Sequence, residues 1–276
     1  MKQLLELYRA AVSNELEQIL SYWMQYAVDD EQGGFYGRIN NDNAIDSKAA
    51  KGSVLNSRIL WAFAAAYRQS GKKEYLAMAQ RAFDYISKYF IDKEYGGVYW
   101  TVDNYGKPLD TKKQVYGLAF ALYGITEYMR CDKSIAAGNL AKQLFDCIEQ
   151  HSYDTGQTGY FEAFTRDWKE MQDLRLSAKD ANEKKTMNTH LHVLEAYTNL
   201  YRVSPDALLK ERITGLIHNF LDHFIDKQSH HLILFFDENS FTSLYTQIAL
   251  GFLAGLGSHE LIHKIDEIIK VLFAKS

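Results

Sequence analysis

A loop motif that recurs about every sixty residues constrains this chain more than any other feature. Its clearest copies, at residues 29–36 and 92–99, read DDEQGGFY and DKEYGGVY, and weaker copies lie at residues 154–161 and 226–233. The copies begin 63, 62 and 72 residues apart. Glycine permits a tight turn within a copy, and the aromatic residues that follow favour a short extended segment. A period of this length indicates a repeat architecture in which each unit is a helical hairpin plus one loop.

Long segments with a helical period separate the copies of the loop motif. Pro108 and Pro205 are the only prolines, so few positions interrupt these segments. The period predicts helices at residues 3–28, 52–70, 73–90, 112–131, 134–151, 184–202, 206–225, 242–256 and 259–274. The chain is therefore expected to be all-α. Repeated hairpins bury their apolar faces by stacking as an open solenoid or by closing into a ring of inner and outer helices.

The composition is that of a globular protein with one large core or two modest ones, because 47% of the 276 residues are hydrophobic and 24% are charged. A net charge of −4 provides no basic field, so nucleic acid and anionic membranes are not expected partners. The N-terminal segment is amphipathic and lacks the features of a signal peptide, which predicts a cytoplasmic protein. Cys131 and Cys147 have no ligand-type spacing and are expected to be packing residues.

The segment from Lys184 to Arg202 holds the densest group of proton-handling side chains. Asn188, His192 and Glu195 follow one another at helical spacing and form one polar line beside an apolar face. His190 is rotated by about 200° from His192, so the two imidazoles cannot share one metal ion on a helix. A buried histidine near an asparagine is often only a satisfied core pair.

Polar residues recur at similar heights on the second helix of successive units. Arg58 lies nine residues before a tyrosine of its helix, and His192 lies nine residues before a tyrosine of its own helix. Tyr116 is about one turn from the matching position in the unit between them. Singly, these are ordinary surface or core residues. Together they predict a shared central cavity, because a ring core without a function is expected to be apolar.

Six segments carry a specific resemblance: GGFYGRI, KGSVLNSRILW, FIDKEYGGVYWTVD, KQVYGLAFALYG, GYFEAFTRDW and MNTHLHVLEAYTNLYR. They closely resemble the N-acylglucosamine 2-epimerase family, and within it the cellobiose 2-epimerases, almost continuously from the N-terminus to about Asp237. The resemblance implies an (α/α)6 barrel that interconverts sugars epimeric at C2 without a metal or redox cofactor. It implies β-1,4-linked disaccharides as substrates, although an N-acyl monosaccharide stays open.

The resemblance also assigns roles to residues of this chain. It implies that His192 assists ring opening and proton transfer and that the Arg58 cation stabilises the developing enediolate. It further implies that Tyr116 and Asn188 bind the sugar and that Trp61 and Asp180 line the site. We expect His190 to bind the sugar as well.

The sequence departs from the family after about residue 240. Members of the family continue with a helix containing SYGHDIE, whose histidine is one of the two C2 bases, whereas residues 241–257 read FTSLYTQIALGFLAGLG. We therefore expect residues 1–276 to be a single barrel domain, divergent or truncated after about residue 240, with about four and a half of six units. His259 and His263 are poor substitutes because they belong to another helix. Uncovered barrel edges predict self-association.

Two further functions stay open at the level of the sequence. The chain can be an inactive sugar-binding or interaction protein that keeps only the recognition half of the site. It can also be a glycosidase on a similar barrel, for which a pair of carboxylates such as Glu162 and Asp167 has to flank the scissile bond. Those two acids lie in a loop segment, which favours a structural role for them.

Overall fold

The computed structural model describes residues 2–236, and helices dominate this part of the chain. The helices are α1 (Lys2–Tyr26), α2 (Ser53–Ser70), α3 (Lys73–Tyr85), α4 (Val115–Met129), α5 (Ile135–His151), α6 (Met187–Val203) and α7 (Ala207–Asn219). Single π-helical turns, η1 (Ile86–Phe90) and η2 (Phe220–Phe224), extend α3 and α7. The helices expected between residues 3 and 225 all form, and those expected at residues 242–256 and 259–274 lie outside the described residues.

Local capping explains several helix ends. The Thr186 side chain accepts a hydrogen bond from the Thr189 amide at the start of α6, and Asp206 caps α7 in the same way. Gly71 caps the C-terminus of α2, and its φ of 72° is left-handed. Since such caps stand where the helical period begins or stops, the predicted and observed boundaries agree within a few residues. The helix α4 starts at Val115 rather than near residue 112, because β4 (Lys113–Gln114) pairs with a neighbouring strand.

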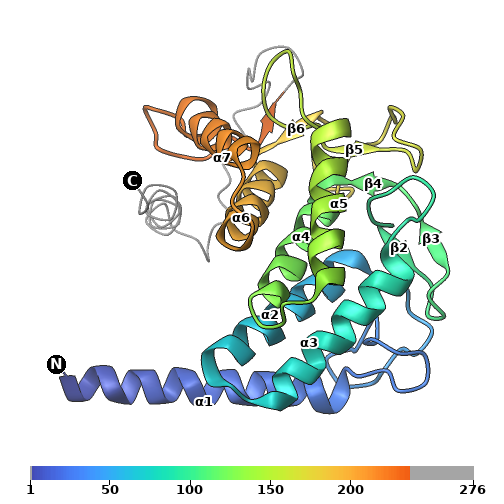
Figure 1. Cartoon of the computed structure of the whole chain (residues 1–276), viewed down its shortest axis with the longest axis vertical. Helices are drawn as coiled ribbons and strands as arrows, with labels where there is room; N and C mark the ends of the chain where they lie inside the picture. The colour runs from blue at the N-terminus through green and yellow to red at the C-terminus, as the bar shows by residue number, and fades with distance from the viewer. Residues whose placement is uncertain (1, 237–276) are drawn as a thin grey trace.

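The helices form three antiparallel hairpins, α2 with α3, α4 with α5, and α6 with α7, that follow one another around an arc (Figure 1). The first helix of each hairpin contacts the first helix of the next, so α4 packs between α2 and α6 on the inner side. Gly124 allows a close approach there, since a Cβ atom at this position would lie 2.6 Å from the Ser57 carbonyl oxygen. This arrangement confirms the predicted all-α fold of the (α/α)-barrel type.

Short antiparallel strands join consecutive units ahead of the inner helices. Strand β1 (Lys51–Gly52) pairs with β2 (Thr101–Val102), which also pairs with β3 (Pro108–Asp110). Strand β4 pairs with β5 (Ala163–Phe164), and β6 (Lys185–Thr186) pairs with β7 (Phe235–Phe236). Each inner helix therefore begins directly after a strand that is fixed to the following unit.

The four copies of the loop motif have the same local structure. A single β-bridge closes each copy, as between Val28 and Phe35 in the first. The first Asp of every copy accepts hydrogen bonds from the backbone amides two and three residues later. The fifth residue is left-handed in all four: Gly33 has a φ of 79°, Gly96 of 74°, Thr158 of 62° and His230 of 59°. The repeat read from the sequence is thus real, including its weaker copies.

Three of these loops are tied to an inner helix by a buried ion pair, here called an Asp–Lys loop pair. The Nζ···Oδ2 distances are 2.7 Å for Lys51–Asp29, 2.8 Å for Lys113–Asp92 and 2.6 Å for Lys185–Asp154. All three lysine side chains are at most 1% exposed. The loop motif in the sequence predicts the position of the aspartates but not of the lysines, which stand just before the inner helices α2, α4 and α6.

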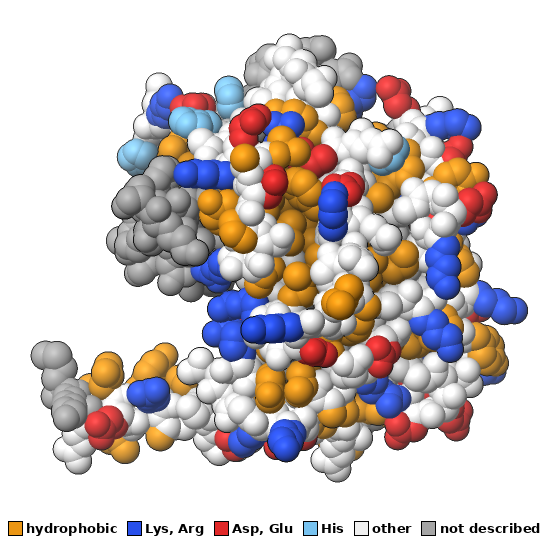
Figure 2. Space-filling model, in the orientation of Figure 1, with side chains coloured by type: hydrophobic (Ala, Val, Ile, Leu, Met, Phe, Trp, Pro, Cys, Tyr) orange, Lys and Arg blue, Asp and Glu red, His pale blue; other side chains and the backbone are white. Residues whose placement is uncertain are grey.

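The N-terminal part of α1 differs from the hairpins because it extends away from them and leaves apolar side chains exposed, whereas Leu20 in its C-terminal part joins the core (Figures 1 and 2). Leu4, Leu5 and Tyr8 are each about 70% exposed, and Val12 is 50% exposed. The expected self-association through uncovered apolar surface stays a prediction. No helix within residues 2–236 is both long enough and apolar enough to span a membrane.

Candidate functional site

The three inner helices bring Arg58, Tyr116 and His192 together around one aromatic ring, that of Phe120. The His192 ring centroid lies 4.4 Å from that of Phe120 and 4.8 Å from that of Tyr116. The Arg58 guanidinium carbon lies 5.2 Å from the Phe120 centroid, within the range of a cation–π contact. The predicted meeting of these three side chains is therefore present. We call Arg58, Tyr116, Phe120 and His192 the inner cluster.

A carboxylate orients the imidazole of the inner cluster. His192 Nδ1 lies 2.8 Å from Glu195 Oε2, one turn further along α6, and the two side chains are 17% and 13% exposed. A proton on Nδ1 satisfies this contact and leaves the Nε2 lone pair of the neutral ring as a proton acceptor. The polar line read from the sequence thus has the geometry of a positioned general base.

Tyr116 and Arg58 supply a neutral donor and a cation at the same place. Burial raises the pKa of the Tyr116 hydroxyl, and the nearby Arg58 opposes this shift. The phenol therefore keeps its proton at neutral pH and can donate it in a hydrogen bond. Arg58 is exposed, and its guanidinium lies over the Phe120 ring of the inner cluster. Such a pair suits an oxygen atom that gains negative charge during a reaction.

Three other residues expected at the sugar, Asn188, Trp61 and Asp180, lie near the inner cluster. Asn188 is half-buried one turn before His192 on α6. Trp61, also half-buried, is one turn beyond Arg58 and stacks on Tyr123 with centroids 5.3 Å apart. Asp180 belongs to the loop at residues 165–184, where its carboxylate accepts hydrogen bonds from the amide and hydroxyl of Ser177. Its charge nevertheless contributes to raising the pKa of Tyr116.

His190 occupies a different environment from the residues of the inner cluster. Its side chain is 0% exposed, Nδ1 lies 2.7 Å from the Thr186 carbonyl oxygen, and Nε2 accepts the Tyr160 amide hydrogen at 2.9 Å. Burial lowers its pKa to about 3, so the ring is neutral. Both ring nitrogens bind backbone groups on the outer side of α6, which corrects the expectation that His190 contacts the sugar. The physical reason is the rotation of about 200° from His192.

The pair of acids needed for a glycosidase is not assembled. Glu162 is 1% exposed and accepts hydrogen bonds from two threonine hydroxyls. Asp167 binds the Thr165 hydroxyl and forms an ion pair with Lys169 at 2.6 Å. The two carboxylates thus face different surroundings, and the glycosidase reading loses its structural basis. Residues 2–236 contain no cluster of His, Cys, Asp and Glu that is suited to a metal ion.

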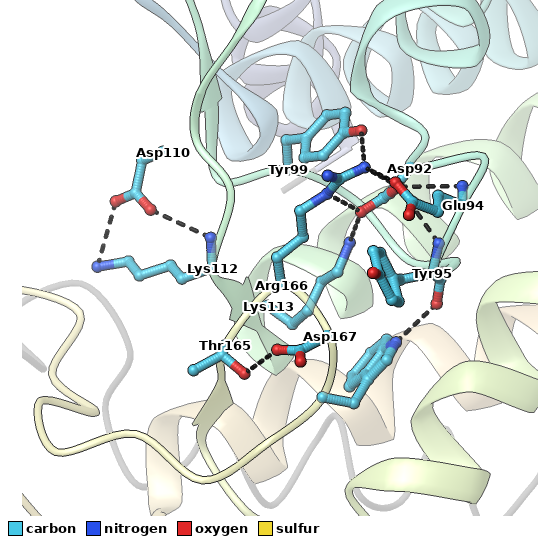
Figure 3. Close-up of polar contacts among 11 residues, drawn as sticks. Asp92, Glu94, Tyr95, Tyr99, Asp110, Lys112, Lys113, Thr165, Arg166 and Asp167 are labelled. Atoms are coloured by element: carbon cyan, nitrogen blue, oxygen red, sulfur yellow. Dashed lines mark hydrogen bonds and ion pairs between the residues drawn. The ribbon is translucent and has the colours of Figure 1, made fainter.

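The loop at residues 165–184 is fastened to the unit before it (Figure 3). The Arg166 guanidinium donates to both carboxylate oxygens of Asp92, at 2.9 and 3.0 Å, and Lys113 Nζ donates to the same group. Gln114 Nε2 donates to the carbonyl oxygens of Leu174 and Arg175 further along the loop. These contacts hold the segment that carries Asp180 against the start of α4.

Comparison with known proteins gives one consistent result. The profile of the N-acylglucosamine 2-epimerase (GlcNAc 2-epimerase) family matches residues 34–244. The chain is 46% identical to a cellobiose 2-epimerase of Bacteroides fragilis over 98% of its own length and 71% of that protein. It is 39% identical to one of Ruminococcus albus, covering 80% of this chain and 56% of that protein.

Solved structures agree with the sequence relatives. The cellobiose 2-epimerase of Bacillus thermoamylovorans superposes with a TM-score of 0.82 at 43% identity, over 88% of this chain and 62% of that one. A glycoside hydrolase family 76 α-mannanase of Bacteroides thetaiotaomicron reaches a TM-score of 0.63 at 12% identity and shares the fold alone. The chain thus spans between about half and three quarters of the length of these epimerases. On this evidence the chain belongs to the N-acylglucosamine 2-epimerase family.

Proposed function

We propose that this protein is a carbohydrate 2-epimerase that interconverts glucose and mannose at the reducing end of β-1,4-linked disaccharides such as cellobiose. Membership of the family and the names of its relatives support the reaction class and the disaccharide. The observation that carries the proposal is the inner cluster, in which a carboxylate-oriented His192 stands beside Arg58 and Tyr116 around Phe120.

The chemistry of the reaction explains why these side-chain types belong together. The C2 proton becomes acidic only after the sugar ring opens, because the C1 aldehyde then stabilises the carbanion as an enediolate. A base has to remove this proton, and a cation or hydrogen-bond donor has to stabilise the oxygen at C1. Return of a proton to the opposite face of the planar intermediate completes the epimerisation.

The described residues supply several of these functions. His192 exchanges protons during ring opening and enolisation, with Glu195 holding the ring. Arg58 and the Tyr116 hydroxyl bind the oxygen that gains negative charge. Asn188 binds sugar hydroxyl groups, and Trp61 and Asp180 line the space around them. We also propose that residues 1–276 form one barrel domain in the cytoplasm, where unpaired thiols such as Cys131 and Cys147 remain reduced.

Proton exchange at C2 tests the proposal directly. The purified chain is incubated with cellobiose in D2O, and NMR follows deuterium at C2 and the appearance of glucosylmannose. We expect incorporation with the unchanged chain, and a rate at least about a hundredfold lower with His192→Ala. His218→Ala is the matched control, since His218 is exposed on α7 and should leave the rate unchanged.

Two outcomes contradict the proposal. Saturable binding of cellobiose without any deuterium incorporation means that the protein only recognises the sugar. Incorporation that survives His192→Ala at the full rate means that another group moves the C2 proton.

A further inference from the structure

Glu162 is a buried carboxylic acid to which the proposed reaction assigns no role, and its backbone joins two inner helices. Its carbonyl oxygen accepts the Val115 amide hydrogen at 3.0 Å, at the first residue of α4. Its own amide donates to the Lys184 carbonyl oxygen at 2.9 Å, directly before β6 and α6. Val115 precedes Tyr116, so the backbone of Glu162 connects the starts of α4 and α6, two of the three helices that bear the inner cluster.

The side chain of Glu162 binds the first turn of α6 through both oxygens. Oε2 accepts the Thr186 hydroxyl at 2.8 Å, and Oε1 accepts the Thr189 hydroxyl at 2.5 Å. Thr186 Oγ1 in turn accepts the Thr189 amide hydrogen at 3.1 Å as the helix cap. Asn188 lies between these two threonines in the sequence, and His192 follows one turn later. The carboxylate thereby binds the first turn of α6, which carries Asn188 and directly precedes the turn of His192.

Among the described residues, no hydrogen-bonded cation balances the charge of this carboxylate. Within residues 2–236, neither oxygen is hydrogen-bonded to a lysine or an arginine, and Lys185 is bound instead to Asp154. Burial raises the pKa of Glu162 to about 7, Asp180 in the loop at residues 165–184 adds to this, and the two threonine hydroxyls oppose it. On α4, Tyr116 is the titratable group that responds to the charge of Glu162.

We propose that Glu162 is a positioning residue for the proposed epimerisation, because its buried carboxylate aligns the first turns of α4 and α6 so that Tyr116, Asn188 and His192 face one substrate. The inference rests on the proposed function. Only the ionised group accepts from both threonines with its two oxygens. When it binds a proton it becomes a donor, and one hydroxyl has to turn away. Proton binding by Glu162 therefore rearranges its hydrogen bonds to the first turn of α6.

The test compares Glu162→Gln with a matched control in the intact chain. The control is Glu127→Gln on α4, because Glu127 is equally buried at 2% exposure but binds Arg68 and Arg130, away from the start of the helix. C2 deuterium exchange with cellobiose is measured between about pH 5.5 and pH 8.5, together with KM and thermal unfolding.

We expect Glu162→Gln to lower kcat about tenfold above neutral pH, to leave KM within about twofold, and to remove one ionisation from the kcat profile. Glu127→Gln should lower the unfolding temperature and leave the shape of the profile unchanged. Thr189→Val keeps the carboxylate but removes one donor, so a loss of kcat in the same direction is expected even if Glu162→Gln folds poorly.

A profile with the same shape in the unchanged chain, Glu162→Gln and Thr189→Val overturns the inference. NMR of the His192 imidazole and the Asn188 side-chain amide tests the positioning role of Glu162 without depending on epimerase activity. If the unchanged chain exchanges no C2 proton, the proposed function fails. The positioning role fails independently when these NMR signals titrate identically in the unchanged chain and in Glu162→Gln.

Discussion

Asp92 and Glu162 are both buried carboxyl groups beside the start of an inner helix, but their surroundings differ in charge. Asp92 meets the Lys113 ammonium at 2.8 Å and the Arg166 guanidinium at 2.9 Å (Figure 3). Although burial opposes it, hydrogen bonding to Arg166 and Lys113 lowers the pKa of Asp92 well below its usual range. Within residues 2–236, the Glu162 carboxylate is hydrogen-bonded to threonine hydroxyls and to no cation, and burial raises its pKa to about 7.

The difference shows how one fold uses the same chemical group in two ways. A carboxylate with two cations stays ionised over the whole physiological range, so it acts as a permanent connection between loop and helix. A carboxylate with hydroxyl partners alone gains and loses a proton near neutral pH, so its hydrogen bonds change with pH. The first arrangement is suited to holding the repeat together, and the second to adjusting the helix that carries His192.

The largest expected effect comes from removing the charge of Asp92. Asp92→Asn leaves the fully buried Lys113 ammonium without its anion, and such a loss costs about 3–5 kcal/mol of unfolding free energy. Urea unfolding of the purified variant and of the unchanged protein measures this loss of unfolding free energy. Asp146→Asn serves as control, because its pair with Lys142 is exposed, and its removal should change the unfolding free energy by less than about 1 kcal/mol. Equal effects of the two substitutions would contradict the distinction between buried and exposed pairs.

A smaller effect, opposite in its pH dependence, is expected from Glu162. Its folded pKa of about 7 lies above the ordinary value of 4.5, so between these values the folded protein holds a proton that the unfolded chain releases. The stabilisation of the folded state by this proton is complete below about pH 4.5 and is lost as the pH rises through about 7. It amounts to about 3 kcal/mol of unfolding free energy. Asp92 behaves oppositely, since its contribution is lost only as the pH falls through its lowered pKa.

Measuring the unfolding free energy of the unchanged chain and of Glu162→Gln at about pH 5 and pH 8 tests this sign. The variant should be less stable than the unchanged chain by a larger margin at the lower pH. If the difference in unfolding free energy between the two proteins is the same at about pH 5 and pH 8, Glu162 does not titrate between these pH values.

Much of the fold was predictable because it depends on local patterns. Helical periodicity and the near absence of proline gave the helices, and the loop motif gave the hairpin repeat. The buried Asp–Lys loop pairs were not found, because a lysine at the start of a helix looks like a solvent-exposed charge. Only the packing of successive units removes Lys51, Lys113 and Lys185 from water.

The candidate site was predictable to the extent that matching positions in a repeat meet in space. Arg58, Tyr116 and His192 follow this rule, since all three gather around Phe120, whereas the shared cavity and their chemical roles stay predictions. His190 was placed wrongly, since helical rotation turns it to the outer side. Phe120 was overlooked because an apolar residue on an apolar helix carries no polar signal. Glu162 was weighed as a catalytic acid, and its contacts with α6 could not be read from spacing.

The smallest expected effect concerns the third copy of the loop motif, whose Asp154–Lys185 pair resembles that of Asp92 and Lys113. Thr158 adopts a φ of 62° where the first two copies have glycine, and a β-branched residue is strained in this region. Its carbonyl oxygen accepts a hydrogen bond from Lys185 Nζ at 2.8 Å, and a substitution of the side chain leaves this contact in place. Thr158→Gly therefore relieves strain without touching the ion pair.

We expect Thr158→Gly to raise the unfolding free energy by about 0.5–1 kcal/mol, because the strain removed exceeds the additional entropy of glycine in the unfolded chain. The reverse change in the second copy, Gly96→Ala, should destabilise the protein, since a Cβ atom there would lie 2.8 Å from Cys147 Sγ. Thermal unfolding of both variants measures the two effects. If Thr158→Gly instead lowers the unfolding free energy, the entropy that glycine adds to the unfolded chain outweighs the strain of threonine at this φ, and the prediction is wrong.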